Sequence, residues 1–192
     1  MDKVSFEIFE AEKKPFRFTP DWIIGILWFT PLLMLWLFNG DSKPNGVFGT
    51  IVTTYFIGVF VITIYFLIVS FSTYKPLKGR LAGEIQFEKD RIIVNGTFFS
   101  LQDIRNLEFN FGDYFGEKDP KSYKSVNPML SQGVDNYVSF ADSANQNQLI
   151  YFKITGPHSR TSLAPFINEA IKMKKMELKH GIDLIGIENV NA

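Results

Sequence analysis

Two long uncharged runs of apolar residues lie near the start of the chain. They are Trp22–Phe38 and Val47–Phe71, and residues 39–46 between them are rich in turn formers. About 17 to 25 apolar residues can cross the hydrocarbon core of a bilayer as a helix, whereas a lone strand would leave its backbone groups unsatisfied in lipid. The pattern therefore predicts a transmembrane helical hairpin over residues 20–73.

Local residues predict where the first helix begins and where it needs support. Thr19, Pro20 and Asp21 form the cap, proline and acid pattern of a helix start. Pro31 has no N–H, so we expect it to kink the helix and to free a carbonyl that a neighbouring helix must cover. A cleaved signal peptide is disfavoured by the acidic leader and by the missing small-residue cleavage pattern. Two buried helices of a soluble protein are the other alternative.

The cations that flank the two runs predict their orientation. Loops on the cytoplasmic side of membrane spans carry an excess of Lys and Arg. These residues are Lys3, Lys13, Lys14 and Arg17 before the first run, Lys75, Lys78 and Arg80 after the second, and Lys43 alone between them. We therefore expect the N-terminal segment 1–19 and the C-terminal part of the chain to lie in the cytoplasm.

After residue 80 the hydrophobic pattern changes to the alternation of strands. The expected strands are 83–88, 91–95, 97–101, 104–111, 136–141 and 148–155, with Asn95-Gly96 as a strong hairpin turn. An amphipathic helix is expected over Ser162–Lys179, with Gly181 ending it. The segment 80–181 is thus predicted to be an antiparallel β-barrel or sandwich closed by a C-terminal helix, which makes the chain an α+β membrane protein.

The segment GEIQFEKDRIIVNGTFFSLQDIRNLEFNFGDYFG, with two apolar runs before it and a closing helix after it, resembles the bacterial pleckstrin-homology-like membrane proteins. The likeness covers roughly residues 75–180 and the hairpin. It implies a PH-like binding module tethered to the cytoplasmic (inner) membrane of a bacterium as a multi-pass protein with both termini inside. The turn Glu88-Lys89-Asp90-Arg91 departs from the basic pattern of inositol-phosphate binders, because two acids offset its two bases.

Composition and motifs exclude several classes of function. The 20 Lys and Arg balance 20 Asp and Glu, so a nucleic-acid-binding protein is not expected. The chain has no Cys, which excludes disulfides and thiol chemistry. His158 and His180 would lie about 30 Å apart along one continuous helix and could not share a metal. No enzyme motif is present, so we predict no catalytic residue, no metal and no cofactor.

Two groups of basic residues are candidates for contact with an anionic membrane surface. The first directly follows the second apolar run, and the second has the i, i+3, i+7 spacing of one helix face. They are Lys75, Lys78 and Arg80, and Lys172, Lys175 and Lys179. For the first group, the alternative is a signal that only sets the orientation in the membrane. For the second group, it is an ordinary solvent-exposed helix face.

The loop 112–134 is long for a compact domain. It mixes aromatic and apolar residues with lysines, which is the composition of many contact surfaces. The residues expected to contact a partner are Tyr114, Phe115, Tyr123, Met129 and Leu130. A flexible insertion without a partner is the alternative.

Both ends of the chain are more apolar than free ends usually are. Val4–Phe9 alternates like a strand and could pair with the cytoplasmic domain, and the tail 182–192 could add a strand to that domain or to a partner. Together these features predict a non-enzymatic, membrane-anchored interaction module that acts as an adaptor or accessory subunit. Its partners would be the bilayer and other proteins, with a homo-oligomer left open, and a sensor of anionic lipid headgroups is the alternative function.

Overall fold

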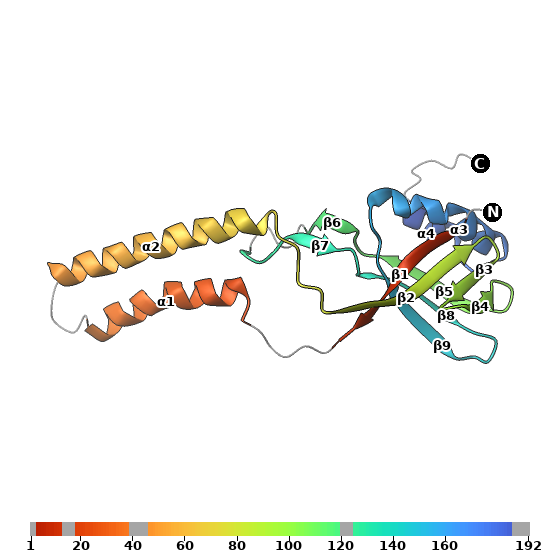
Figure 1. The fold of residues 1–192 in the computed structure, drawn as a ribbon, viewed down its shortest axis with the longest axis horizontal. Helices are drawn as coiled ribbons and strands as arrows, with labels where there is room; N and C mark the ends of the chain where they lie inside the picture. Colours follow the sequence, from red (N-terminus) through yellow and green to blue (C-terminus); the bar gives the residue numbers. More distant parts are fainter. Residues whose placement is uncertain (1–2, 13–17, 39–45, 120–124, 186–192) are drawn as a thin grey trace. The chain divides into compact units, whose positions relative to one another are not determined.

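The computed structural model describes residues 3–12, 18–38, 46–119 and 125–185 (Figure 1). The chain forms two compact units, each made of segments that are separate in the sequence. The helical unit consists of residues 15–75 and 118–130. The sheet unit consists of residues 1–14, 76–117 and 131–192, and it holds a large antiparallel sheet and two further helices. The predicted α+β class is therefore confirmed.

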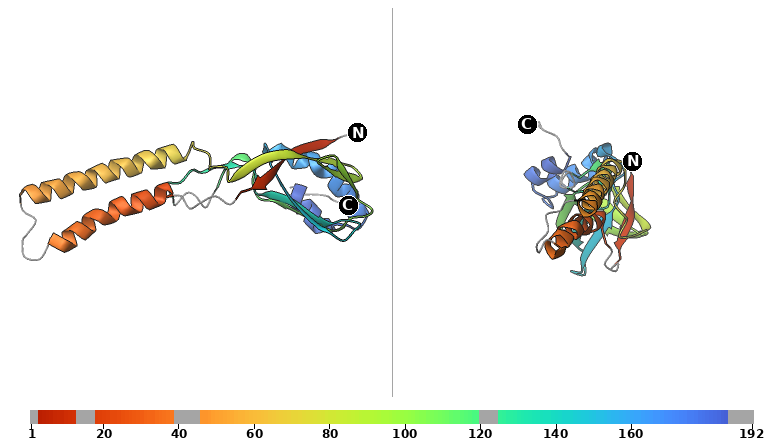
Figure 2. Two further views of the ribbon diagram at one scale, coloured as in Figure 1. Left: turned by 60° about the horizontal axis from the view of Figure 1, so that its bottom comes forward. Right: turned by 90° about the vertical axis from the view of Figure 1, so that its left-hand side faces the viewer.

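The helical unit contains two apolar helices, α1 (Pro20–Phe38) and α2 (Val47–Ser70), which lie side by side (Figure 2). Within the described residues one stretch, Gly49–Ser70, is long and apolar enough to cross a membrane, and only 6% of its most apolar 18-residue window is buried. The corresponding apolar stretch of α1, Pro20–Leu33, is shorter. The structure thus supports one candidate span by length, and the second span of the predicted hairpin is not supported on this criterion.

The backbone of α1 carries the expected consequence of Pro31. Because Pro31 has no N–H, the carbonyl of Leu27 four residues earlier has no donor within the helix. The hydroxyl of Tyr55 on α2 donates to this carbonyl at 3.2 Å, and Trp28 Nε1 donates to Thr63 Oγ1 at 3.1 Å. The prediction that a neighbouring helix covers the freed carbonyl is confirmed.

The sheet unit is built on seven antiparallel strands in the order β4-β3-β2-β1-β9-β8-β5. Their bounds are β1 (Val4–Ala11), β2 (Gly79–Glu88), β3 (Arg91–Val94), β4 (Thr97–Ser100), β5 (Arg105–Phe111), β8 (Asn136–Ala141) and β9 (Asn147–Phe152). In the described chain no pairing joins the end strands β4 and β5, so the closed barrel is wrong. The connection between them buries Leu101 and Ile104 in the core, and side-chain packing rather than a ladder fills this corner.

The strand β1 precedes the two helices in the sequence but occupies the middle of the sheet. It pairs with β2 from Val4 to Ala11 and with β9 over two positions, so the predicted pairing of the N-terminal segment is confirmed. The ladder continues beyond β1, where Glu12 N donates to Lys78 O at 3.0 Å. The two apolar helices are therefore an insertion between neighbouring strands of one sheet.

The core of the sheet unit is a cluster of phenylalanine rings between the sheet and helix α3 (Ala164–Lys172). Phe87 on β2 is its centre, and its ring centroid lies within 6.1 Å of those of Phe6, Phe109, Phe152 and Phe166. Edge-to-face contacts of this kind stabilise beyond the area that they bury. Because β1, β2, β5, β9 and α3 all contribute rings, the inserted helices do not interrupt the core.

The C-terminal helix differs from the prediction of one helix over 162–179. Helix α3 ends at Lys172, and a second helix, α4 (Leu178–Ile185), follows after a turn. Lys174 adopts a left-handed conformation with φ 57°, which stops the first helix.

Gly181 was expected to end a helix, but it lies inside α4 at a close approach to α3. A Cβ atom at this position would come within 2.5 Å of the Ile171 side chain, so the two helices pack closely because residue 181 has no side chain. The tail expected to form a strand, 182–192, is helical up to Ile185. Residues 186–192 lie outside the described residues.

Candidate functional site

The segment 112–134, predicted to be a loop, contains two short strands. These are β6 (Phe115–Lys118) and β7 (Leu130–Gln132), which pair with each other. We call residues 119–129 between them the strap; its residues 120–124 lie outside the described residues. The equally short strands β3 and β4 are recognisable because the Asn95-Gly96 turn joins them, whereas no two-residue turn joins β6 and β7.

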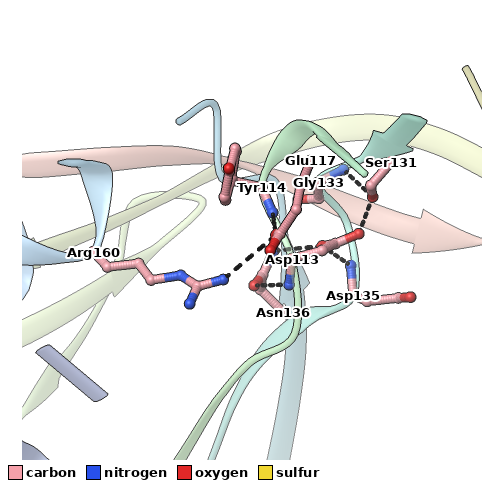
Figure 3. A network of polar contacts seen from close by, with 8 residues as sticks. All are labelled: Asp113, Tyr114, Glu117, Ser131, Gly133, Asp135, Asn136 and Arg160. Atoms are coloured by element: carbon pink, nitrogen blue, oxygen red, sulfur yellow. Dashed lines mark hydrogen bonds and ion pairs between the residues drawn. The ribbon is translucent and has the colours of Figure 1, made fainter. Parts of the chain in front are cut away.

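A polar network holds the bases of β6 and β7 in the sheet unit (Figure 3). The carboxylate of Asp113 accepts hydrogen bonds from Ser131 Oγ, from the Asp135 N–H at 2.9 Å and from Asn136 Nδ2 at 3.2 Å. The buried Asn136 also accepts from Asp113 N at 3.3 Å and donates to Gly133 O at 2.8 Å. Because a buried amide is costly to leave unpaired, these bonds favour one conformation of the segment.

Gly133 allows two backbone segments to cross closely within this network. Its φ of +71° is left-handed, and an added Cβ would lie 2.3 Å from Ile154 O and 2.5 Å from Phe115 N. The same crossing is closed by Phe115 N donating to Ile154 O and Ile154 N donating to Gly133 O, both at 2.8 Å. Only glycine fits at this position without displacing the backbone.

Arg160 lies beside the network (Figure 3) and also faces the ring of Phe111. Its Nη2 is 3.9 Å from Glu117 Oε2, and its guanidinium is 5.9 Å from the ring centroid of Phe111. Glu117 Oε2 also accepts from Tyr114 N at 3.0 Å. In the described part of the chain, Arg160 Nε is buried without a hydrogen-bond partner, whereas the carboxylates around it are already bonded. These contacts hold Glu117 on β6 and Arg160 together.

In the helical unit the strap binds the N-terminal end of α1 through Asp21. The carboxylate of Asp21 accepts from Ser125 Oγ at 2.7 Å, from Val126 N at 2.8 Å and from Asn127 Nδ2 at 2.7 Å. Asp21 N in turn donates to Asn127 Oδ1 at 3.4 Å. An acidic first-turn residue also interacts favourably with the helix dipole. Asp21 therefore has a second role, which its place in the sequence does not reveal.

The strap and the residue after it also bind the C-terminal end of α2. Met129 N donates to Ser70 O at 3.0 Å, Leu130 N to Thr73 O at 3.1 Å, and Lys75 N to Leu130 O at 2.8 Å. Met129 is fully buried. Met129 and Leu130, which were predicted to contact a partner, thus serve contacts within the chain, and the strap ties the ends of both helices together.

The other three residues predicted to contact a partner have different environments. Tyr114 packs against the core of the sheet unit. Phe115 is 37% exposed, and the ammonium of Lys153 lies 4.8 Å from the centroid of its ring. Tyr123 lies outside the described residues.

Four of the six cations predicted to contact lipid have partners within the protein. The pairs are Lys75 with Asp119, Arg80 with Glu10, Lys172 with Glu169, and Lys175 with the carbonyl oxygens of Gln102 and Ile104. The hydrogen bond to Glu10 and its charge raise the pKa of Arg80. Lys78 and Lys179 are exposed. Since α3 ends at Lys172, the three C-terminal lysines do not lie on one helix, and their predicted common face is wrong.

The described residues contain no group of three His, Cys, Asp or Glu side chains that could hold a metal ion. His158 lies in a 3-10 turn before α3, and His180 lies in α4. The two histidines are therefore on separate elements and not at the two ends of one helix.

A hollow on the outer face of β5, β8 and β9 was missed in the sequence. Tyr137 and Tyr151 point outward there because their neighbours Val138 and Phe152 point into the core. Tyr137 donates to Glu108 Oε1 at 3.3 Å. Burial, followed by the charge and hydrogen bond of Glu108, raises the pKa of Tyr137. The alternation along each strand could have identified the rings of Tyr137 and Tyr151 as pointing outward. It could not have shown that the two rings line the same hollow.

Comparison with known proteins assigns no function to these features. No family model, curated protein or solved structure matches the chain. The likeness to pleckstrin-homology-like membrane proteins stays a prediction. Evidence on function therefore comes from the inserted helices, the strap and the hollow.

Proposed function

We propose that this protein is a membrane-anchored interaction module. In this proposal α1 and α2 form a transmembrane hairpin in the inner membrane of a bacterium, and the sheet unit binds protein partners in the cytoplasm as an adaptor or accessory subunit. The observation that carries the proposal is the insertion of both helices between the paired strands β1 and β2.

The pairing of β1 with β2 restricts how the inserted segment can cross a membrane. Glu12 and Lys78 are joined by a backbone hydrogen bond, so the chain between them leaves and returns at one place. If Gly49–Ser70 crosses the bilayer, the rest of the insertion must cross it a second time. Helix α1 has 19 residues, or about 28 Å at 1.5 Å per residue, which is close to the roughly 30 Å hydrocarbon core. The length of α1 and the paired ends of the insertion support α1 as the second span.

The exposed side chains of both helices favour lipid over water. Trp22, Phe29, Trp36, Phe60 and Ile68 are each more than half exposed. In water, each Å² of such surface costs about 25 cal/mol relative to an apolar environment. Trp22 and Trp36 also lie near the two ends of α1, as tryptophans at membrane interfaces do.

The flanking charges support a cytoplasmic sheet unit. Seven Lys and Arg residues lie in segments 1–19 and 75–80, against one in 39–46. Because short cytoplasmic segments are rich in Lys and Arg, the sheet unit is assigned to the cytoplasm.

A binding role is supported better than lipid sensing. Most of the cations expected to contact an anionic surface are bonded within the chain, whereas the sheet carries a hollow lined by Tyr137 and the exposed Tyr151. The strap fixes both helix ends. These observations support a sheet unit that offers a binding surface and is held by anchored helices.

Alkaline extraction of membranes tests the anchor. The full chain is expected to stay in the membrane pellet, because hydrophobic spans resist alkali that removes peripheral proteins. In a control variant a Gly/Ser linker replaces residues 20–70, and this variant should be released while keeping the circular dichroism of a β-sheet. Release of the unaltered chain would contradict the anchor. A neighbour-free monomer in crosslinking of native membranes would contradict the adaptor role.

A further inference from the structure

The outer face of the sheet unit has a hollow of about 490 Å³ over β5, β8 and β9. Its lining includes Glu108, Tyr137, Ser139, Leu149 and Tyr151. Leu149 is 56% exposed and Tyr151 is 37% exposed, so the described chain does not cover them. We call this surface the tyrosine hollow.

Two aromatic rings and one carboxylate define the chemistry of the tyrosine hollow. Tyr137 and Tyr151 pair directly across β8 and β9, with ring centroids 5.7 Å apart and planes at 61°. The carboxylate of Glu108 accepts from the Tyr137 hydroxyl at 3.3 Å. Glu108 is the one charged side chain of the lining, and it makes no ion pair with any described residue. The surface therefore combines aromatic faces with an unneutralised negative charge.

A β-bulge places Glu108 at this surface. The pairing of β5 with β8 shifts between Arg105 and Glu108, and Asn106 within the bulge has a left-handed φ of 51°. After the bulge Leu107 is buried, and Glu108 points to the outer face opposite Ser139. Bulges re-aim side chains in this way and are frequent beside functional sites.

We propose that the tyrosine hollow binds an arginine side chain of a protein partner, which deepens the proposed function and rests on it. The planar guanidinium stacks on aromatic faces and donates hydrogen bonds to a carboxylate, so one arginine matches both features. A lysine ammonium would satisfy Glu108 but would stack less well on the rings. The pKa of Tyr137 is raised, so its phenol stays protonated and remains a hydrogen-bond donor to Glu108.

The test is a titration of the full chain in detergent micelles, followed by NMR of ¹³C-labelled tyrosine rings. The chain has 7 Tyr residues, and the signals of Tyr137 and Tyr151 are assigned with Tyr→Phe variants. The probe is an acetylated, amidated Gly-Gly-Arg-Gly-Gly peptide. Its twin carries citrulline, which keeps the shape and removes the charge. The arginine peptide should shift both ring signals in a saturable way, and the citrulline peptide should bind about tenfold more weakly.

Two variants separate the carboxylate from general charge effects. Glu108→Gln should weaken binding of the arginine peptide about fivefold and leave the citrulline peptide unchanged, whereas the exposed Glu177→Gln should leave both unchanged. Equal binding of the two peptides would overturn the proposal and leave Tyr137 and Tyr151 as a cross-strand pair that only stabilises the sheet. Tetramethylammonium competing as well as the arginine peptide would also overturn it, because the hollow would then suit a lipid headgroup.

These outcomes are independent of the membrane anchor. A chain that resists alkaline extraction but fails the titration refutes the arginine site alone. A chain that is extracted but binds the arginine peptide refutes the anchor, while the site itself is retained.

Discussion

Removing the Tyr55 hydroxyl tests whether Pro31 makes α1 depend on a hydrogen-bond donor from α2. In Tyr55→Phe the carbonyl of Leu27 loses its donor, since the proline offers no N–H to it. In Pro31→Ala the alanine supplies that N–H, and Leu27 is then satisfied within its own helix. The same tyrosine substitution should therefore be costly in one background and nearly neutral in the other.

The expected cost follows from the geometry of one bond. The bond is 3.2 Å long and partly buried. Hydrogen bonds between membrane helices contribute about 0.6 kcal/mol on average and up to about 1.7, and an orphaned buried carbonyl costs roughly 1–3 kcal/mol. We expect Tyr55→Phe to lower the free energy of helix separation by about 1 kcal/mol, and by no more than about 0.3 kcal/mol with Pro31→Ala. Tyr65→Phe is the matched control, because Tyr65 is 62% exposed on the same helix.

The absence of cysteine makes this measurement direct. Thr19→Cys and Ser72→Cys accept a pair of fluorescent labels at the strap end of the two helices, and energy transfer during a titration with sodium dodecyl sulfate reports their separation. A coupling of about 0.7 kcal/mol between the two substitutions is expected. Equal costs in both backgrounds would refute the reasoning, since the tyrosine would then act independently of the proline.

Three further predictions concern the strap, the polar network and the contact between β1 and β2. Asp21→Asn should increase hydrogen exchange at residues 125–130 by about tenfold or more, because three donors lose their carboxylate, whereas the exposed Asp183→Asn should not. Gly133→Ala should destabilise the sheet unit by about 2 kcal/mol or more in thermal denaturation, whereas Gly156→Ala, which meets open space, should change little. Hydrogen bonds, from Ser5 first, lower the pKa of Glu84, so its contribution is present at neutral pH and is lost as pH falls through the folded-state pKa. Glu84→Gln should thus lower the melting temperature at neutral pH, and this loss should shrink as the pH falls below the ordinary glutamate pKa of about 4.3; a loss that does not change with pH would exclude this linkage.

Much of the local structure is predictable from the sequence because it depends on neighbouring residues. The strand 136–141 is predicted with its observed bounds, since apolar and polar positions alternate between clear turns. The two helices follow from the absence of charge, and the need for a donor at Leu27 follows from Pro31 alone.

The unpredicted features depend on partners that are distant in the sequence. The position of β1 between β2 and β9 is not encoded in its own alternation, and whether the end strands β4 and β5 pair, which decides between an open sheet and a barrel, is not encoded in theirs. The donors to Asp21 lie more than 100 positions away, so its role in the strap contact is invisible locally. The break after Lys172 depends on a left-handed Lys174, a conformation that lysine rarely adopts.

Labelling of single cysteines in intact and permeabilised cells tests the central claim most directly. Glu12→Cys and Lys78→Cys mark the two ends of the insertion, and Asp41→Cys marks the segment between the helices. A membrane-impermeant maleimide should label the Asp41→Cys variant in intact cells and the other two only after permeabilisation. Labelling of Glu12→Cys and Lys78→Cys from opposite sides would contradict the pairing of β1 with β2, and labelling of all three from one side would contradict the hairpin.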